Sequence, residues 1–273
     1  MRKLPCRSGF GSGWGWGVGA PPRPSAPAFP ALPATGSLVL NLNPNNNTSI
    51  TFNGSRVASI SSELQGAAAV QDQGALQPLL AAFGATGRMG FSCDGAQALR
   101  AENVTLPAGF TFAGVIDAAG GEGGMIAEHS TNAFNTKNGF WLRSIASTNS
   151  AYIRRNPTDR FVGPIGPTPD WAADAAAPCA FVLRYDDAAE RLDLWIDGGA
   201  PADTATPALS SPAGTVNDTL YLLARAEASS MIADAVVGRL SCWNVPLPLA
   251  EVSQALASLG GEWTIATTEA TLA

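Results

Sequence analysis

The chain has 273 residues, 46% of them hydrophobic, and its 16 Lys and Arg against 22 Asp and Glu give a net charge of −6. An acidic chain with few basic clusters is not typical of nucleic-acid-binding proteins, and no stretch approaches the ~20 apolar residues of a membrane span. Charged residues make up only 14% of the chain, below the ~25% usual in soluble domains, which favours a subunit of a packed assembly over a free enzyme.

The first 36 residues have an unusual glycine pattern. Glycine occupies every second position from Gly9 to Gly19, and large apolar side chains fill most of the positions between. A two-residue period predicts an extended strand with its large side chains on one face. Ordering so many glycines has an entropy cost that nothing nearby offsets, so we expect residues 1–36 to be an attachment arm ordered by another protein. An arm without fixed structure is the alternative. The expected anchoring side chains are Phe10, Trp14, Trp16 and Val18.

Secretion signals and cysteine motifs are not apparent in the sequence. Pro5 and the glycines after it interrupt any apolar run that follows Arg2 and Lys3, so no signal peptide is expected. The four cysteines are far apart and form no Cys-X-X-Cys pair, which argues against a zinc or redox site. Three of them lie in apolar, strand-like runs and are expected to be reduced and buried, namely Cys93, Cys179 and Cys242.

Beyond Ser37, short strand-like runs alternate with turn residues such as Asn53-Gly54, which predicts an all-β domain. The expected strands are Leu38–Leu42, Ser49–Phe52, Arg56–Ile60, Gly90–Cys93, Phe110–Asp117, Gly124–Glu128, Gly139–Ile145, Ser150–Arg154, Cys179–Tyr185, Arg191–Ile196, Thr219–Ala224 and Ala235–Trp243. The spacing of Leu76, Leu79, Leu80 and Phe83 predicts a helical turn after Pro78.

The clearest local unit runs from Cys179 to Gly199. Apolar residues alternate with polar ones on both sides of a turn at residues 186–190, which predicts an antiparallel hairpin. The alternating residues are Phe181, Leu183 and Tyr185, then Leu192, Leu194 and Ile196. Near the C-terminus, apolar residues recur at spacings of three and four from Leu249 to Leu259 and stop at Gly260-Gly261, which predicts one short amphipathic helix.

These two units resemble a known family. Residues 181–199, Phe-Val-Leu-Arg-Tyr-Asp-Asp and then Arg-Leu-Asp-Leu-Trp-Ile-Asp-Gly-Gly, resemble the central hairpin of concanavalin A-like, laminin G-like jelly rolls. Residues 237–244 and the helix after them look like that family's last strand and closing helix, and residues 89–95 are similar to its early Phe-Asp-Gly strand. The resemblance implies an antiparallel β-sandwich over residues 37–265, followed by a tail at 266–273. Arg239 stands where the family's last strand commonly carries a carboxylate.

No catalytic residue is predicted. Glucanases of this fold share a Glu-X-Asp-X-X-Glu strand, which sets two carboxylates at the ~5 Å needed for retaining hydrolysis, and the sequence has no such string. The single histidine lies in Glu128-His129-Ser130 without a Gly-X-Ser-X-Gly nucleophile motif, so it is interpreted as structural or solvent-exposed. Asp193 and Asp197 lie on one hairpin strand and are interpreted as surface carboxylates.

Two kinds of ligand have candidate residues. Turn residues with side-chain oxygens are what a calcium site in such a jelly roll requires, but turn aspartates mostly bond their own backbone, so no metal is predicted and calcium is the alternative. These residues are Asp186, Asp187, Asp197, Asp234 and Asn217-Asp218. For a glycan, the candidates are Trp171 with its neighbour Asp170, Trp195 and Tyr152. Trp141 and Trp243 lie in apolar runs and are interpreted as core residues.

A glycine-rich leader before such a jelly roll also resembles virion proteins of tailed bacteriophages and of gene transfer agents. The resemblance implies a non-enzymatic virion protein, present in several copies, that is fixed to other virion proteins by its arm and displays a lectin-like sandwich. A module that binds host surface glycans is the first alternative, and a secreted polysaccharide hydrolase is the second. The absence of a paired-carboxylate strand and of a signal peptide weighs against the hydrolase.

Overall fold

The structure is a computed structural model of the chain. It describes residues 30–33, 36–63, 67–107, 109–117, 124–130, 139–145, 148–154, 160–164, 178–201, 203–206, 209, 216–225, 230–231 and 235–272. The predicted arm anchors Phe10, Trp14, Trp16 and Val18 therefore lie outside the described residues, as do the glycan candidates Asp170 and Trp171, and so do Cys6 and Asp234.

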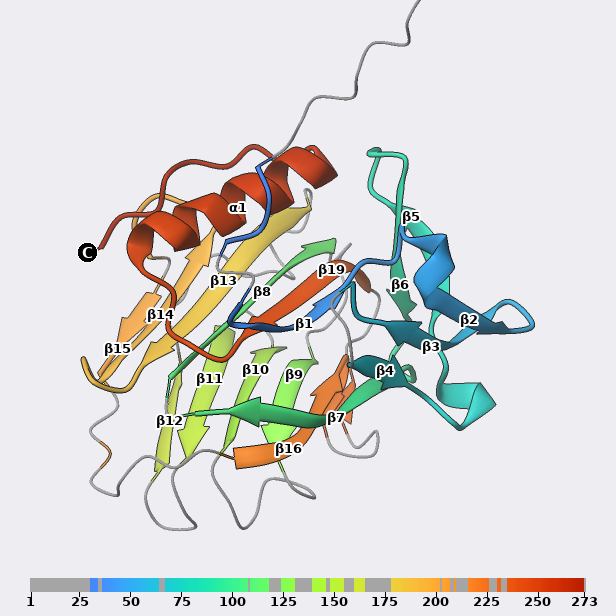
Figure 1. Cartoon of the computed structure of the whole chain (residues 1–273), viewed down its shortest axis with the longest axis horizontal. Helices are drawn as coiled ribbons and strands as arrows, with labels where there is room; N and C mark the ends of the chain where they lie inside the picture. Colours follow the sequence, from blue (N-terminus) through green and yellow to red (C-terminus); the bar gives the residue numbers. More distant parts are fainter. Residues whose placement is uncertain are drawn as a thin grey trace, which may run out of the picture.

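Two antiparallel sheets packed face to face form the body of the protein, and one helix covers the outside of one of them (Figure 1). The sheet under the helix, called the helix-side sheet, runs in the order β15 (Asp203–Ala205), β14 (Arg191–Ile196), β13 (Cys179–Asp186), β8 (Phe110–Asp117), β19 (Ala235–Trp243) and β1 (Leu38–Leu42). The opposite sheet, called the far sheet, runs in the order β12 (Arg160–Pro164), β11 (Thr148–Arg154), β10 (Gly139–Ile145), β9 (Met125–Ser130), β16 (Val216–Leu222) and β7 (Leu99–Leu106).

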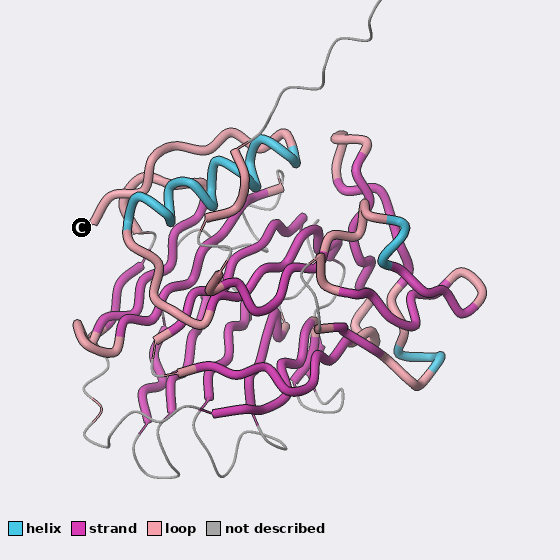
Figure 2. Tube along the Cα trace, viewed as in Figure 1, coloured by secondary structure: helices cyan, strands magenta, loops and turns pink. Residues whose placement is uncertain are grey.

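Short strands join the two sheets at one side, where Figure 2 shows strands and loops that project from the sandwich on the right. They are β2 (Ile50–Asn53), β3 (Arg56–Ser61), β4 (Ala68–Val70), β5 (Leu79–Phe83) and β6 (Arg88–Cys93), with the 3-10 turns η1 (Asn47–Ser49) and η2 (Gly74–Leu76). β6 pairs with β19 and β4 pairs with β7, so the hydrogen-bonded ladder continues from one sheet into the other. The pair β17 (Ala224–Arg225) and β18 (Ser230–Met231) follows β16.

The main core fills the space between the two sheets, and the predicted hairpin contributes to it as expected. Phe181 pairs with Ile196 and Leu183 pairs with Leu194, so the alternating apolar residues of β13 and β14 share the face toward the far sheet. Phe110 and Phe140 stack across the core with ring centroids 4.1 Å apart. The all-β jelly roll predicted from the sequence is confirmed.

A second core lies between the helix-side sheet and the helix α1 (Leu249–Trp263). α1 packs on β13 and β8 through residues spaced by three and four, as its sequence pattern predicts. The helix continues past the expected stop at Gly260. That glycine does not end the helix but lets the chain at Ile265 and Thr267 pack closely against it. An added Cβ there would lie 2.5 Å from the Cγ2 of Thr267. The helix ends at Thr264, which has a left-handed φ of 58°.

The prediction for Trp195 as a glycan-binding ring is wrong. Trp195 has no exposed surface, because β14 is covered on both faces, by the main core on one side and by α1 and the C-terminal segment on the other. Its indole Nε1 donates a hydrogen bond of 3.0 Å to the carbonyl of Thr271. The alternation that was taken to expose this face instead separates two buried faces.

The helical turn predicted around Leu79 is also wrong. Leu79 and Leu80 belong to β5 and pair with Ser92 and Phe91 of β6. Phe83, at the end of β5, packs edge to face against Trp263 of α1, with ring centroids 4.6 Å apart. Pairing with β6 and burial under the helix therefore override a local spacing that also fits a helix.

The sandwich extends beyond both predicted boundaries. Before Ser37, Leu32 is buried in the helix-side core, and the indole of Trp243 donates to the carbonyl of Pro33 at 2.9 Å. After residue 265, the chain runs beside the turn at 197–199 and Ala270 is buried. Gly198 has a φ of +95°, and an added Cβ would lie 2.0 Å from the carbonyl oxygen of Thr268, so this turn requires glycine. Residues 30–33 and 265–272 are thus part of the folded domain.

The cysteines of the described residues behave as predicted. Cys93 and Cys242 are buried, Cys179 is half-buried, and all three are free thiols. Burial raises the pKa of Cys242 to about 12 and raises the pKa values of Cys93 and Cys179 well above the ordinary range. A thiol held in its neutral form is a poor nucleophile, so these cysteines act as small apolar side chains.

Among the described residues, no helix has the length and apolar character needed to cross a membrane.

Candidate functional site on the far sheet

The far sheet has one face toward the main core and one away from it, here called the outer face. Phe140, Leu142 and Ile153 of β10 and β11 point into the core. Residues that alternate with them occupy the outer face, and directly paired residues of neighbouring strands share a face. The register therefore sets one row across the outer face, formed by Arg100 of β7, Tyr221 of β16, Glu128 of β9 and Trp141 of β10. Tyr152 of β11 pairs with Trp141 at the end of this row.

A β-bulge at the start of β9 shapes the outer face. Leu142 pairs with Ala127, whereas Arg143 pairs with Met125, so one extra residue is inserted on β9. Met125 and Trp141 form a small apolar cluster of their own, separate from the main core. The interpretation of Trp141 as a core residue is confirmed, since the side chain is only 6% exposed, but it packs in this small cluster and not in the main core.

Glu128 is a buried carboxylate at the middle of the row. Its side chain has no exposed surface. Ser130, two residues further along β9, donates its hydroxyl to Glu128 Oε1 at 2.7 Å, and Arg225 Nε lies 3.8 Å from Glu128 Oε2. A buried carboxylate needs such partners to stay ionised. Glu128 therefore fixes the position of Arg225, whose side chain is 37% exposed at the surface.

Arg143 lies beside this pair and is held by Trp141. Its guanidinium carbon is 4.5 Å from the centroid of the Trp141 ring, in a cation–π contact. Within the described structure, the Nε of Arg143 is buried and has no hydrogen-bond partner. Burial lowers the pKa of Arg143, and the nearby charge of Arg225 lowers this pKa further. Two guanidinium groups thus lie close together, and one of them has an unused donor.

Part of the far sheet has the opposite charge to the chain as a whole. Strands β9 to β12 and β17 contain four arginines and a single acidic residue, Glu128, whereas the whole chain has a net charge of −6. The arginines are Arg143, Arg154, Arg160 and Arg225. A positive patch on an acidic protein attracts negatively charged ligands.

His129 points the other way, into the core, which confirms the structural alternative of its interpretation and not the solvent-exposed one. It is 1% exposed, its Nε2 lies 2.8 Å from the carbonyl of Val104, and its ring stacks on Phe140. Burial lowers its pKa, while the Val104 carbonyl and the charge of Asp218 oppose that shift. The neutral ring donates its Nε2 proton to Val104, which is a structural role.

The burial of His129 predicts an acid-sensitive stability. An unfolded chain binds a proton at His129 below pH ~6.5, whereas the folded chain does so only at lower pH, so the free energy of unfolding should fall as the pH falls from 7.5 to 5.5. The slope from one histidine is at most ~1.4 kcal/mol per pH unit. Urea unfolding at several pH values should show a shallower slope for His129→Gln, and an unchanged slope would contradict the prediction.

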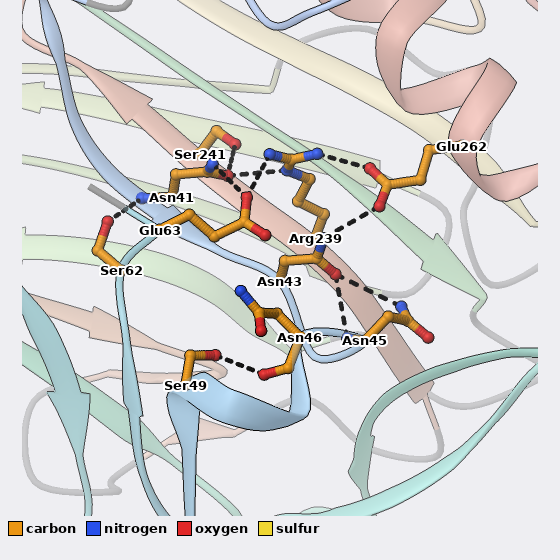
Figure 3. A network of polar contacts seen from close by, with 10 residues as sticks. All are labelled: Asn41, Asn43, Asn45, Asn46, Ser49, Ser62, Glu63, Arg239, Ser241 and Glu262. Atoms are coloured by element: carbon orange, nitrogen blue, oxygen red, sulfur yellow. Dashed lines mark hydrogen bonds and ion pairs between the residues drawn. The ribbon is translucent and has the colours of Figure 1, made fainter. Parts of the chain in front are cut away.

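Figure 3 shows a second polar cluster, on the helix side, around Arg239 of β19. Arg239 donates from Nε to Asn41 Oδ1 at 2.8 Å, from one terminal nitrogen to Glu262 at 2.6 Å and from the other to Glu63 at 2.7 Å. The cluster borders a depression of about 480 Å³ whose other lining includes Arg88 and Leu32. All three nitrogens of this guanidinium group have a partner, so the cluster links β1, β19 and α1 and is interpreted as structural.

The turn aspartates within the described residues serve the backbone and neighbouring side chains. Asp186 accepts from the amide of Ala189, Asp187 accepts from the hydroxyl of Tyr185, and Asp197 accepts from the amide of Ala180. Burial raises the pKa of Asp197, and the Ala180 amide opposes this shift. No group of three or more His, Cys, Asp or Glu side chains in the described ranges could hold a metal ion.

Sequence reasoning found part of the outer face. It named Tyr152, which the register sets beside Trp141, and it considered the Glu128-His129-Ser130 string only as a catalytic motif. It missed Arg143 and Arg225. A sequence signal for this face was present. Trp141 and Arg143 alternate with apolar residues on their strand, and Glu128 and Ser130 alternate with core residues on theirs.

No protein-family model matches the sequence, and no curated protein shows significant similarity to it. Solved structures share the fold at low identity. The binding domain of botulinum neurotoxin serotype D/C is 11% identical with a TM-score of 0.53, covering 82% of this chain and 52% of that one. Domain 4 of AbnA, a GH43 extracellular arabinanase from Geobacillus stearothermophilus in complex with arabinotriose, is 9% identical with a TM-score of 0.52, covering 81% of this chain and 98% of that one.

A sialidase of Trypanosoma rangeli is 13% identical with a TM-score of 0.51, covering 89% of this chain and 37% of that one. The chain thus spans about half the length of the toxin binding domain and a smaller share of the sialidase, but nearly all of the arabinanase domain. At these identities the likeness concerns the fold alone. The chain is an antiparallel β-sandwich closed by one C-terminal helix, and these solved structures share that fold.

Proposed function

We propose that this protein binds carbohydrate through the outer face of the far sheet. The observation that carries the proposal is the row of Tyr221, Glu128 and Trp141 across three neighbouring strands, with Arg143 and Arg225 beside it. The core needs none of these side chains, because the opposite face of the same strands already fills it. Polar and aromatic groups held on a rigid sheet suit the recognition of sugar hydroxyls and ring faces.

The likeness to the arabinanase domain supports this proposal. That domain has the same fold over almost its whole length, and its structure contains arabinotriose. In the present protein, Arg143, Tyr221 and Arg225 are partly exposed and supply donors, whereas Glu128 and Trp141 lie beneath them and hold them in place. Few groups are exposed, so binding by one copy should be weak, with a Kd on the order of a millimolar, unless several copies act together.

We expect the bound glycan to remain uncleaved. A retaining hydrolase needs two carboxylates ~5 Å apart, and an inverting one needs two at a larger spacing. Glu128 is the only acidic residue in β9 to β12 and β17. In the rest of the far sheet, Glu102 of β7 contacts Arg100, and Asp218 of β16 is buried near His129. This supports a binding module over a polysaccharide hydrolase.

A glycan array probed with the full chain, multimerised for avidity, tests the proposal. We expect binding to at least one saccharide class, and a loss of at least tenfold in affinity for Arg225→Ala, because this change removes a donor that Glu128 holds at the surface. Arg88→Ala, in the depression beside Arg239, is the matched control and should bind normally. If the full chain bound no saccharide on the array, the proposal would be refuted.

A virion location with an attachment arm is a second proposal. The observation that favours it is that residues 31 and 32, at the start of the described chain, are held against α1. Gln254 of α1 donates to the carbonyl of Ala31 at 2.8 Å, and Leu32 is buried under the helix. The described chain therefore begins beside α1, away from the outer face of the far sheet, so attachment through the residues that precede it would leave that face free. Imaging of intact particles with the chain located in them tests this proposal, and its absence from every particle would refute it.

A further inference from the structure

We infer that the saccharide bound at the outer face is acidic, and that Arg143 and Arg225 bind its anionic group. The inference rests on the proposed function and adds the chemical class of the ligand. A carboxylate or a sulfate on a sugar ring provides the same chemistry here, since each presents two or three coplanar or clustered oxygens to the donors of a guanidinium group.

The first argument is the pairing of two like charges. Arg143 pairs with Met125 of β9, and β17, which carries Arg225, also contacts β9. Both arginines therefore border the same strand, and the charge of Arg225 lowers the pKa of Arg143. Glu128 is 3.8 Å from Arg225 and lies below it, on the side of the sheet. Two guanidinium groups near one another repel, and an anion bound between them removes that repulsion. A neutral sugar would leave it in place.

The second argument is the unused donor on Arg143. Its Nε is buried and has no hydrogen-bond partner within the described structure, although leaving a buried donor without a partner is energetically unfavourable. The described contact of its guanidinium group is the ring of Trp141, which offers a face but no acceptor atom. An anionic oxygen is the acceptor that best matches a charged donor.

The third argument is preorganisation. The Trp141 ring holds the guanidinium group of Arg143, while Glu128 holds Arg225 and is itself held by the hydroxyl of Ser130. Both arginines keep part of their surface exposed, so a ligand can reach them without unfolding the sheet. Side chains already fixed in position lose little entropy on binding, which favours a small charged group over a diffuse polyanion.

The fourth argument is the local charge. Strands β9 to β12 and β17 contain four arginines and one glutamate, in a chain whose net charge is −6. The rest of the protein repels a long polyanion such as a nucleic acid, whereas a short acidic oligosaccharide meets only the positive face. The observations therefore favour an acidic saccharide over a nucleic acid.

The test compares acidic oligosaccharides with their neutral counterparts by isothermal titration of the full chain. Trigalacturonic acid is matched with its methyl ester, 3′-sialyllactose with lactose, and a sulfated galactan trisaccharide with its desulfated form. We expect at least one acidic member to bind at least tenfold more tightly than its partner, and its affinity to fall as salt rises from 50 to 500 mM. The pair that responds tells a carboxylate ligand from a sulfate ligand.

Variants assign the effect to the site. Arg143→Gln should lower the affinity for the acidic saccharide at least tenfold, and Arg143→Lys should recover only part of it, since lysine keeps the charge but loses the fork of donors. Arg225→Gln is the second variant, should Arg143→Gln fail to fold, and Arg88→Gln is the control and should behave as the unmodified chain. Acidic binding that survives both Gln variants would overturn the inference.

The outcomes separate the two levels of the proposal. Equal or tighter binding of the neutral members overturns the acidic class while the carbohydrate-binding function stands. A lack of binding to every saccharide, acidic or neutral, overturns both. Binding of a short single-stranded DNA at the same site, more tightly than any acidic sugar, also overturns the inference.

Discussion

Replacing Arg239 with methionine should lower the free energy of unfolding by about 3 kcal/mol, as expected when one partner of a buried ion pair is removed. The change leaves the carboxylates of Glu63 and Glu262 without the cation that both contact, at 2.7 and 2.6 Å. Their side chains are 25% and 13% exposed, so water replaces the lost partner only in part. Asn41, which accepts from Arg239 Nε, also loses a donor. Urea unfolding followed by tryptophan fluorescence measures the loss.

A surface ion pair provides the matched control for Arg239. Arg100 contacts Asp72, whose side chain is 73% exposed, so Arg100→Met should cost less than about 1 kcal/mol. Adding Glu63→Gln to Arg239→Met should recover part of the stability, because it removes one unpaired charge. A loss below about 1 kcal/mol for Arg239→Met would show that the cluster does not stabilise the fold.

Replacing Trp263 with alanine should cost about 4 kcal/mol, near the upper end for core substitutions, because it opens a large cavity between α1 and the helix-side sheet. Trp263 is fully buried and contacts Phe83 edge to face. The ring also lies against the backbone of β19 at Gly238, where an added Cβ would be 2.7 Å from its Cη2 atom. Only a glycine at that position lets the ring come so close.

Two further variants serve as comparisons for Trp263→Ala. Trp263→Phe should cost much less than Trp263→Ala, since it keeps a ring and removes an indole Nε1 that is buried without a hydrogen-bond partner in the described structure. Leu272→Ala, at a side chain 49% exposed, should change the free energy of unfolding by less than about 0.5 kcal/mol. Equal losses for the Phe and Ala variants would contradict the packing role assigned to the ring. Urea unfolding monitored by circular dichroism suits all three, since the signal does not depend on Trp263.

The outer surfaces of the two sheets have different surroundings. The helix-side sheet is covered by α1 and by both ends of the described domain, through Leu32 and Ala270. Its outer surface is therefore buried and stabilises the fold. The far sheet carries Arg143 and Arg225 on a face that the core does not use. A ligand on the far sheet and an attachment beside α1 would therefore occupy opposite sides of the protein.

Local sequence patterns were sufficient where one face of an element is buried and the period is unambiguous. The alternation in residues 181–196 predicted the β13–β14 hairpin in its observed register, and the spacing from Leu249 to Leu259 predicted α1. Both signals come from neighbours in the sequence, because side-chain direction repeats every two residues in a strand and every 3.6 in a helix. The all-β class followed from the same kind of pattern, whereas the jelly roll was implied by the resemblance of residues 181–199 and 237–244 to a known family.

Only the tertiary structure decided what covers each face. Alternation showed that Trp195 and Phe181 point in opposite directions, but not that α1 and Thr271 would bury Trp195. The spacing around Leu79 fitted a helix and a strand alike, and pairing with β6 selected the strand. Arg143 and Arg225 are 82 residues apart in the numbering, and the ladders joining β10, β9 and β16 bring them together. Such contacts depend on pairing between distant segments, which no local period in the sequence encodes.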